Sequence, residues 1–165
     1  MKNISEQIKS LIEGFIAILN ATFPRPAYDQ DPVTLPMNAV PANNLLNAFC
    51  LAIQKQEGWF PGSRSFRNKS PGNLKYAEQT KSTGKDAHGF AIFSTYEDGL
   101  QALKNQVLLG ARGKSKVYRP TMNLYQFFEI FSPSFDNNDP HHYADVVATA
   151  IKQDPKTFKI SQFLG

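Results

Sequence analysis

The residue best placed for chemistry in this chain is Glu57, at the predicted C-terminal end of a helix. The negative end of a helix dipole disfavours an ionised carboxylate. Trp59 and Phe60 follow directly, and an apolar wall of this kind would also exclude water from the carboxyl group. Both effects raise the pKa of a glutamate, as a general acid working near neutral pH requires. Because most glutamates are simply solvent-exposed, the neighbouring segments must support this interpretation.

The helix that carries this glutamate is predicted from its cap and its apolar period. Asn43 and Asn44 mark its start, since asparagine side chains accept from the free N–H groups of a first turn. Gly58, with Pro61 behind it, is predicted to end the helix in the left-handed conformation. The apolar face at helical spacing consists of Leu45, Phe49, Ala52 and Ile53.

The segment after the helix, residues 61–73, is predicted to be a polar loop. It contains two Pro-Gly pairs and three serines, which argue against a strand. Asn68 and Asn73 add amide donors and acceptors to it. Positive charge comes from Arg64, Arg67, Lys69 and Lys75. A helix that ends in glutamate beside a loop of amide and hydroxyl groups is typical of a sugar-binding cleft.

Residues 57–76 resemble a motif of the phage-type lytic transglycosylases, which belong to the lysozyme-like superfamily. The chain reads EGWFPGSRSFRN and then SPGNLKY, against E-G-x-x-P-G-[ST]-x-[ST]-x-R-N-x-N-P-G-N-[LI]-x-Y, with Ser70 where asparagine is usual. The segment FSTYEDGLQAL is similar to F-x-T-x-E-x-G-x-x-A-L of the same family, and the resemblance covers roughly residues 45–150. It implies a mainly α, lysozyme-like (α+β) domain with a small irregular β and loop region over the cleft.

The resemblance implies that Glu57 is the acid/base of an enzyme that cleaves the MurNAc–GlcNAc β-1,4 bond of peptidoglycan at the bacterial cell wall. The glutamate would protonate the glycosidic oxygen, then accept a proton as the 6-hydroxyl of the sugar attacks the anomeric carbon. Tyr143 in DPHHYADVV resembles a late-helix tyrosine whose hydroxyl reaches the cleft, although it could equally be a core aromatic. The residues expected to contact substrate are Asn68, Asn73, Tyr76, Tyr96 and Tyr143.

Two other functions stay open. A hydrolytic lysozyme would need a second carboxylate, for which Glu78 and Asp86 in the polar loop 77–90 are the candidates. A non-catalytic wall-binding or virion structural module of the same fold would need no carboxylate at Glu57. Nucleic-acid binding is a weaker alternative, and we expect no nucleic-acid partner.

Composition sets outer limits on these functions. With 165 residues, 41% hydrophobic and 19% charged, the chain suits one compact domain plus an appendage. A net charge of +4 favours an acidic polymer such as cell wall, though nucleic acid fits equally well on charge alone. The single cysteine, Cys50, excludes an internal disulfide and is expected in the core. No metal or cofactor is expected, because His141 and His142 are adjacent on a helix and point in different directions.

The N-terminal 42 residues are predicted to be an appendage to a catalytic domain over 43–165. Apolar residues at helical spacing predict an amphipathic helix over roughly 4–21. Charges at Glu6, Lys9 and Glu13 argue against a membrane span or a signal peptide. Five prolines over 22–42 indicate an extended connector. We expect the helix to pack against the domain or a protein partner.

Three further helices are expected. The first starts at a cap formed by Thr95 and Asp98, ends at Gly110, and follows a loop or weak hairpin with a strand over 90–93. The second spans 123–131, and the third starts at Asp139-Pro140. Their predicted buried faces are Leu100, Leu103, Val107 and Leu108 in the first and Tyr143, Val146, Val147, Ala150 and Ile151 in the third. Residues 153–165 are expected to be a packed tail.

Overall fold

The structure, a computed structural model, describes residues 42–136 and 138–165. The chain divides into two units, residues 1–38 and 39–165, and the described residues belong to the second. The predicted helix over 4–21 lies outside the described residues. So does the predicted connector over 22–42, apart from Ala42, where the first described helix starts.

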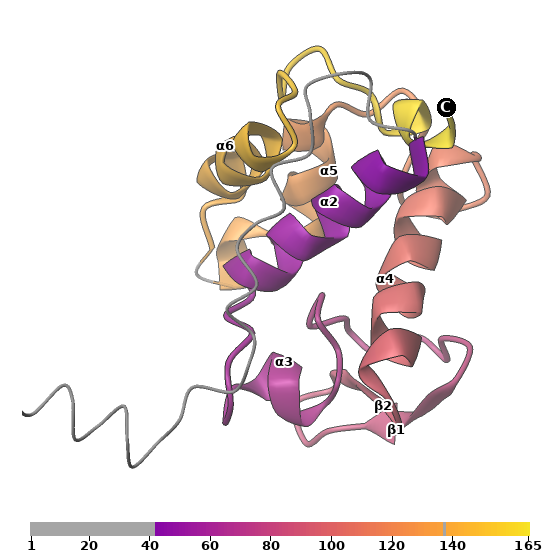
Figure 1. The fold of residues 1–165 in the computed structure, drawn as a ribbon, viewed down its shortest axis with the longest axis vertical. Coiled ribbons are helices and arrows are strands. Elements are labelled where there is room, and N and C mark those ends of the chain that lie inside the picture. Colours follow the sequence, from indigo (N-terminus) through magenta and orange to yellow (C-terminus); the bar gives the residue numbers. More distant parts are fainter. Residues whose placement is uncertain (1–41, 137) are drawn as a thin grey trace, which may run out of the picture. The chain divides into compact units, whose positions relative to one another are not determined.

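The described part is mainly α with one small antiparallel sheet, which confirms the predicted class at this level (Figure 1). Its elements are α2 (Ala42–Gln56), α3 (Arg64–Arg67), β1 (Ser82–Lys85), β2 (Ala91–Phe93), α4 (Tyr96–Ala111), α5 (Leu124–Phe131), α6 (Pro140–Ala150) and the 3-10 helices η1 (Ser134–Asp136) and η2 (Ile160–Leu164). α2 packs against α6, and α6 against α5. α4 begins at the β-hairpin, which lies at the same end of the helix as α3, and extends to η2 (Figure 1).

Local capping sets the starts of α4 and α6, as the sequence predicts. The start predicted for α2 at Asn43 and Asn44 is wrong, because the helix begins at Ala42 and includes both residues. The Thr95 hydroxyl accepts from the Asp98 N–H at 3.1 Å. Asn123 forms a capping box with Gln126, and Asp139 caps α6 with Pro140 in its first turn. Each cap satisfies N–H groups that have no partner within the helix. These caps fix where α4, α5 and α6 begin.

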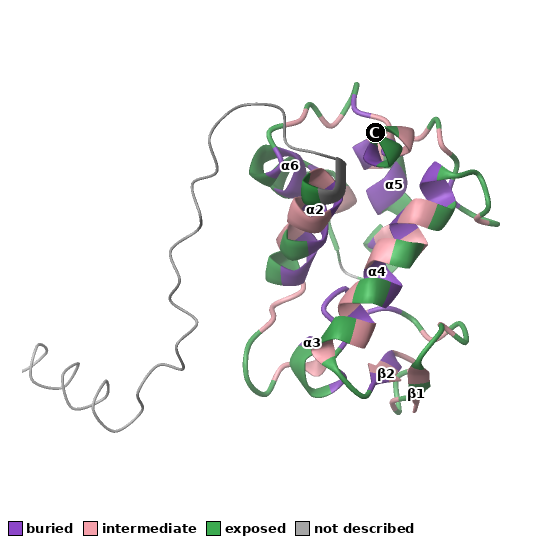
Figure 2. Ribbon diagram, turned by 45° about the vertical axis from the view of Figure 1, so that its right-hand side comes forward, coloured by how far each residue is buried: buried purple, intermediate pink, exposed green. Residues whose placement is uncertain are grey.

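The core is built largely of aromatic rings between α2, α5, α6 and η2. The Phe49 ring lies 4.6 Å from that of Phe163 and 5.7 Å from that of Phe127, centroid to centroid. Cys50 is fully buried beside them, as predicted, and burial raises the pKa of its thiol to about 12. Figure 2 shows the buried residues on the faces of α2, α4 and α5 that look toward one another. The tail also packs, since Phe163 of η2 is 3% exposed.

Two predicted apolar faces are confirmed in part. α2 buries Phe49 and Ile53 as predicted, adds Leu46 and Cys50, and buries Leu45 and Ala52 only partly. The α6 segment buries Tyr143, Val147 and Ile151 as predicted. It also buries Ala144 and Ala148, and leaves Val146 and Ala150 exposed. Small alanines let α6 approach its neighbours closely, so packing of the helices overrides the preference for burying the larger valine.

The hairpin predicted over 77–93 is present. Ser82 pairs with Phe93 and Lys85 with Ala91, with an irregularity after Ser82. The second strand starts at Ala91, one residue later than expected, because Phe90 instead forms a bridge with Lys75. This bridge ties the hairpin to the loop that follows α3.

Two glycines of α4 allow close approach of other segments. A Cβ on Gly99 would lie 1.9 Å from the backbone oxygen of Lys69, so the loop after α3 packs directly on the helix. The prediction that Gly110 ends the helix is wrong, because α4 continues to Ala111. A Cβ on Gly110 would lie 2.8 Å from the Cβ of Tyr118, so this glycine provides space for the following loop.

Candidate active site around Glu57

Glu57 lies directly after the last residue of α2. Its N–H donates to the carbonyl of Ile53 at 2.8 Å. Glu57 is therefore the residue that follows the last helical residue, Gln56, and not the last helical residue itself, as the sequence predicted. Gly58 adopts φ +66°, the predicted left-handed stop. The Ser65 hydroxyl is 3.4 Å from the carbonyls of both Glu57 and Gly58, which holds α3 against this helix end. The single helical turn of α3 falls within the segment predicted to be loop.

The Glu57 carboxyl group contacts two side chains from distant segments. The Tyr143 hydroxyl of α6 donates to Oε1 at 2.8 Å, and the Asn73 side chain also hydrogen-bonds the carboxyl group. Burial raises the pKa of Glu57, while these two hydrogen bonds and the charge of Arg64 oppose the rise without cancelling it. Burial and the adjacent Glu57 hold the pKa of Tyr143 well above its ordinary value, so its hydroxyl stays a donor.

The prediction that Trp59 and Phe60 form an apolar wall beside Glu57 is wrong. Trp59 packs against Phe66 and Tyr96, at ring distances of 5.3 and 5.1 Å. Phe60 is 59% exposed, and neither Trp59 nor Phe60 lines the cavity at Glu57. Glu57 is therefore buried by residues from distant parts of the chain, such as Tyr143 of α6, which is itself 6% exposed.

A cavity of about 710 Å³ opens beside Glu57. Its walls come from α3 with the loop and hairpin that follow, from the end of α4 with the next loop, and from the end of α5 with η1. The volume falls within the range of small-molecule sites, ~300–1,000 Å³. A carboxyl group with a raised pKa thus borders a space large enough for a ligand.

Asn73 is the predicted substrate residue that the structure places beside Glu57. It lines the cavity with φ +46°, a left-handed conformation that asparagine tolerates. Its Oδ1 is buried and has no hydrogen-bond partner. A buried acceptor left without a partner is costly. Asn73 therefore offers an acceptor to a hydroxyl or N–H group of a ligand while its side chain contacts Glu57.

Four other predicted substrate residues do not line the cavity, namely Asn68, Tyr76, Tyr96 and Tyr143. Asn68 is 7% exposed, and its Nδ2 donates to Asp86 at 2.8 Å. The Tyr96 hydroxyl donates to Oε1 of Gln54 at 2.7 Å. Tyr76 packs against the core. Asn68, Tyr76 and Tyr96 thus have structural roles. Tyr143 contacts the Glu57 carboxyl group but does not line the cavity, so Asn73 is the predicted substrate residue that does both.

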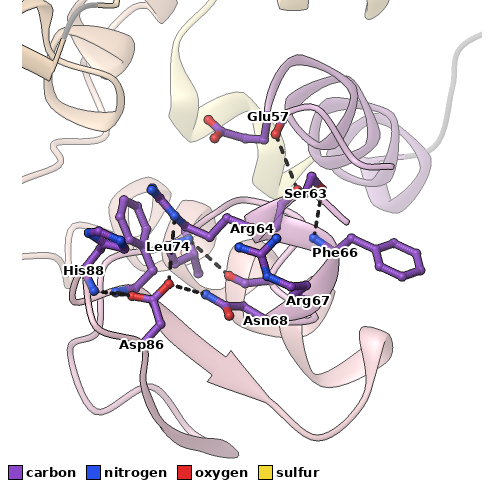
Figure 3. A network of polar contacts seen from close by, with 12 residues as sticks. Glu57, Ser63, Arg64, Phe66, Arg67, Asn68, Leu74, Asp86 and His88 are labelled. Atoms are coloured by element: carbon purple, nitrogen blue, oxygen red, sulfur yellow. Dashed lines mark hydrogen bonds and ion pairs between the residues drawn. The ribbon is translucent and has the colours of Figure 1, made fainter. Parts of the chain in front are cut away.

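Neither of the two loop carboxylates considered as a second catalytic group lines the cavity. Asp86 accepts from the N–H groups of His88 and Phe90, each at 2.9 Å, and from Asn68, with Arg64 at 3.9 Å (Figure 3). Burial acts to raise the pKa of Asp86, but these hydrogen bonds and the Arg64 charge together lower it to about 2. Asp86 therefore orders the turn between the two strands, within the segment predicted to be a polar loop.

One carboxylate of the cavity was not anticipated from the sequence. Asp136, in η1, lines the cavity, whereas Glu78 is exposed and does not. Asp136 falls in a short connection between α5 and α6 that carries no motif, so its sequence gave no signal of a site. Ser132 and Asn138 of the same connection, and Gln106 of α4, are further polar residues of the wall.

Residues 42–136 and 138–165 contain no group of three or more His, Cys, Asp or Glu side chains placed to hold a metal ion. His141 lies 3.2 Å from Glu129 on the protein surface. Within the same ranges, no helix is long and apolar enough to cross a membrane.

Comparison of the chain with models of protein families, with curated proteins and with solved structures finds no match. The function is therefore inferred from the site and from the motif that contains Glu57.

The hydrogen bond from Tyr143 gives a first testable prediction. Because this donor favours the ionised form of Glu57, Tyr143→Phe is expected to raise the pKa of Glu57 further. The measurement is an NMR titration of the side-chain carboxyl carbon of Glu57. Tyr125→Phe is the matched control, since its hydroxyl donates to Asp145 at 2.6 Å and the variant should leave Glu57 unchanged. A lowered pKa in Tyr143→Phe would contradict the assigned contact.

Proposed function

We propose that this chain is a lytic transglycosylase, which cleaves the MurNAc–GlcNAc β-1,4 bond of peptidoglycan at the bacterial cell wall with Glu57 as its single acid/base. A lysozyme-like (α+β) fold is part of this proposal and rests on the resemblance of the motif. The observation that carries it is the Glu57 carboxyl group, with a raised pKa and bound by Tyr143 and Asn73, at the wall of a cavity of about 710 Å³.

The reaction requires Glu57 to donate one proton and then to accept another. Protonated Glu57 donates its proton to the glycosidic oxygen as the bond from that oxygen to the anomeric carbon breaks. The 6-hydroxyl oxygen of the same sugar then bonds to the anomeric carbon, and its proton passes to the Glu57 carboxylate. The products are a 1,6-anhydro-muramic acid end and a free hydroxyl on the leaving sugar, with no water consumed.

Both neighbours of Glu57 suit this cycle. The raised pKa keeps the carboxyl group protonated closer to neutral pH, as the first step requires. The Tyr143 hydroxyl, 2.8 Å from Oε1, stabilises the carboxylate that exists between the two proton transfers. Asn73 borders the cavity at the same carboxyl group and offers its free acceptor to a sugar hydroxyl or acetamido N–H.

A hydrolytic lysozyme is the second candidate, and the presence of Asp136 on the cavity wall favours it. In a hydrolase this carboxylate would activate a water or form a covalent intermediate. A transglycosylase needs no such group, so Asp136→Asn should keep activity within a few-fold of wild type, measured as release of soluble fragments from peptidoglycan. A loss of ~10²-fold or more in a folded Asp136→Asn protein would support the hydrolase instead.

The experiment that tests the enzyme against a binding module uses purified, insoluble peptidoglycan. The full chain should release soluble muropeptides with time, whereas a wall-binding or virion structural module would sediment with the wall and release nothing. Sedimentation of the protein without release of fragments, under conditions where a known muralytic enzyme is active, would refute the proposed activity.

A further inference from the structure

Two cations on the cavity wall share one aromatic ring. The guanidinium carbon of Arg64 lies 4.2 Å from the centroid of the Phe90 ring, and the Nζ of Lys75 lies 3.9 Å from it. All three residues line the cavity at Glu57. The ring attracts each cation through its negative faces and so holds both side chains in place at the cavity.

The two cations differ in their negative partners. Nε of Arg64 lies 3.9 Å from Oδ2 of Asp86. That oxygen also accepts from Nδ2 of Asn68, while Oδ1 of Asp86 accepts from the N–H groups of His88 and Phe90. Lys75 makes no ion pair in the part of the chain that the structure describes. Figure 3 shows Arg64 between Glu57 on one side and Asp86 with His88 on the other. The remaining carboxylate of the wall is Asp136.

An anion on the ligand would complement this wall. Two like charges held at one ring repel each other, and an anion bound near both relieves the repulsion. Arg64 presents a planar guanidinium that can bind both oxygens of a carboxylate, and Lys75 adds a point charge.

We infer that Arg64, Lys75 and Phe90 form a subsite for a carboxylate carried by the glycan, such as the lactyl carboxylate of a muramic acid residue or a free carboxylate of its peptide stem. This inference rests on the proposed function and names the part of the substrate that the site distinguishes. Arg64 and Lys75 occupy positions that the transglycosylase motif leaves open, so the motif itself does not assign them a role. An uncharged glycan of the same length should bind less tightly.

The test compares two tetrasaccharides by calorimetry, with the full chain carrying Glu57→Gln to prevent cleavage. One alternates GlcNAc and MurNAc with free lactyl carboxylates, and the other is chitotetraose, which has none. The alternating tetrasaccharide should bind at least ~10-fold more tightly, the usual scale for one charged contact. Arg64→Gln and Lys75→Met, each added to that protein, should remove most of this preference, because both keep a side chain of similar length without the charge.

Two controls separate the subsite from general charge effects. Lys75→Arg should keep the preference for the alternating tetrasaccharide. Lys55→Met removes an exposed lysine that does not line the cavity and should leave the preference unchanged.

A competition experiment with inorganic phosphate, compared with chloride at the same ionic strength, shows whether the wall prefers phosphate. Competition by phosphate without a preference for the carboxylate tetrasaccharide would overturn the inference.

Equal affinity for the two tetrasaccharides, no binding of either, or a preference that survives both Arg64→Gln and Lys75→Met would also overturn it. These outcomes are distinct from failure of the proposed function, because release of fragments by the unmodified protein is measured separately. A protein that releases muropeptides but shows no preference would keep its activity and lose this subsite.

Discussion

Glu57→Gln is expected to reduce the release of soluble fragments from peptidoglycan by at least ~10²-fold, the usual contribution of general acid catalysis. Glutamine has nearly the same shape but no proton to donate to the glycosidic oxygen. The amide oxygen can still accept from Tyr143, which now donates to Oε1 at 2.8 Å. The variant should therefore fold normally and still bind the wall, with the loss confined to turnover.

The matched control is Glu97→Gln, which removes the same charge from an exposed first-turn position of α4. It should release fragments at the wild-type rate. Time courses of both variants on the same peptidoglycan, with circular dichroism to verify folding, measure the difference. Near-normal release by Glu57→Gln would remove the central residue of the proposed mechanism.

Gly99→Ala is expected to have the largest effect on stability, a loss of about 3 kcal/mol in the free energy of unfolding. A Cβ at this position would lie 1.9 Å from the backbone oxygen of Lys69 and 3.0 Å from Cδ of Pro71. Backbone and a proline ring cannot move aside as a flexible side chain can. Either α4 or the loop after α3 must shift, and that loop leads to Asn73 at the cavity.

Urea unfolding followed by circular dichroism measures this change. Gln101→Ala, on the exposed side of the same helix, is the control and should change stability by only a few tenths of a kcal/mol. In Gly99→Ala, displacement of the loop should also lower the release of peptidoglycan fragments by folded protein. Unfolding at the same urea concentration as wild type would contradict the close approach of α4 and the loop.

The starts of α4, α5 and α6 could be predicted to within a residue, because their caps are local interactions, whereas the start of α2 was placed too late. Thr95, Asn123 and Asp139 each bond to N–H groups within three residues. The faces that the helices bury depend on what packs against them, which is why α6 buries Ala148 where the sequence favoured Val146. Gly110 was misread for the same reason, since the space that it leaves is filled by Tyr118 from the following loop.

The residues of the candidate site also fall into those that local sequence predicts and those that only the fold brings together. Glu57 and Asn73 could be predicted because they belong to one continuous motif. Asp136 could not, since only the fold brings the connection between α5 and α6 to the cavity. The structural role of Asp86 could not be predicted either, because its three hydrogen-bond donors come from a turn and from Asn68, whose approach the sequence does not reveal.

The most direct test of the central claim is mass analysis of the fragments that the full chain releases from peptidoglycan in heavy-oxygen water. A lytic transglycosylase with Glu57 as its only acid/base transfers the sugar's own 6-hydroxyl, so the new ends should be 1,6-anhydro-muramic acid, one water lighter than hydrolysed ends and free of the heavy oxygen. Reducing muramic acid ends that carry the heavy oxygen as the sole product would show that water is the nucleophile and contradict the account.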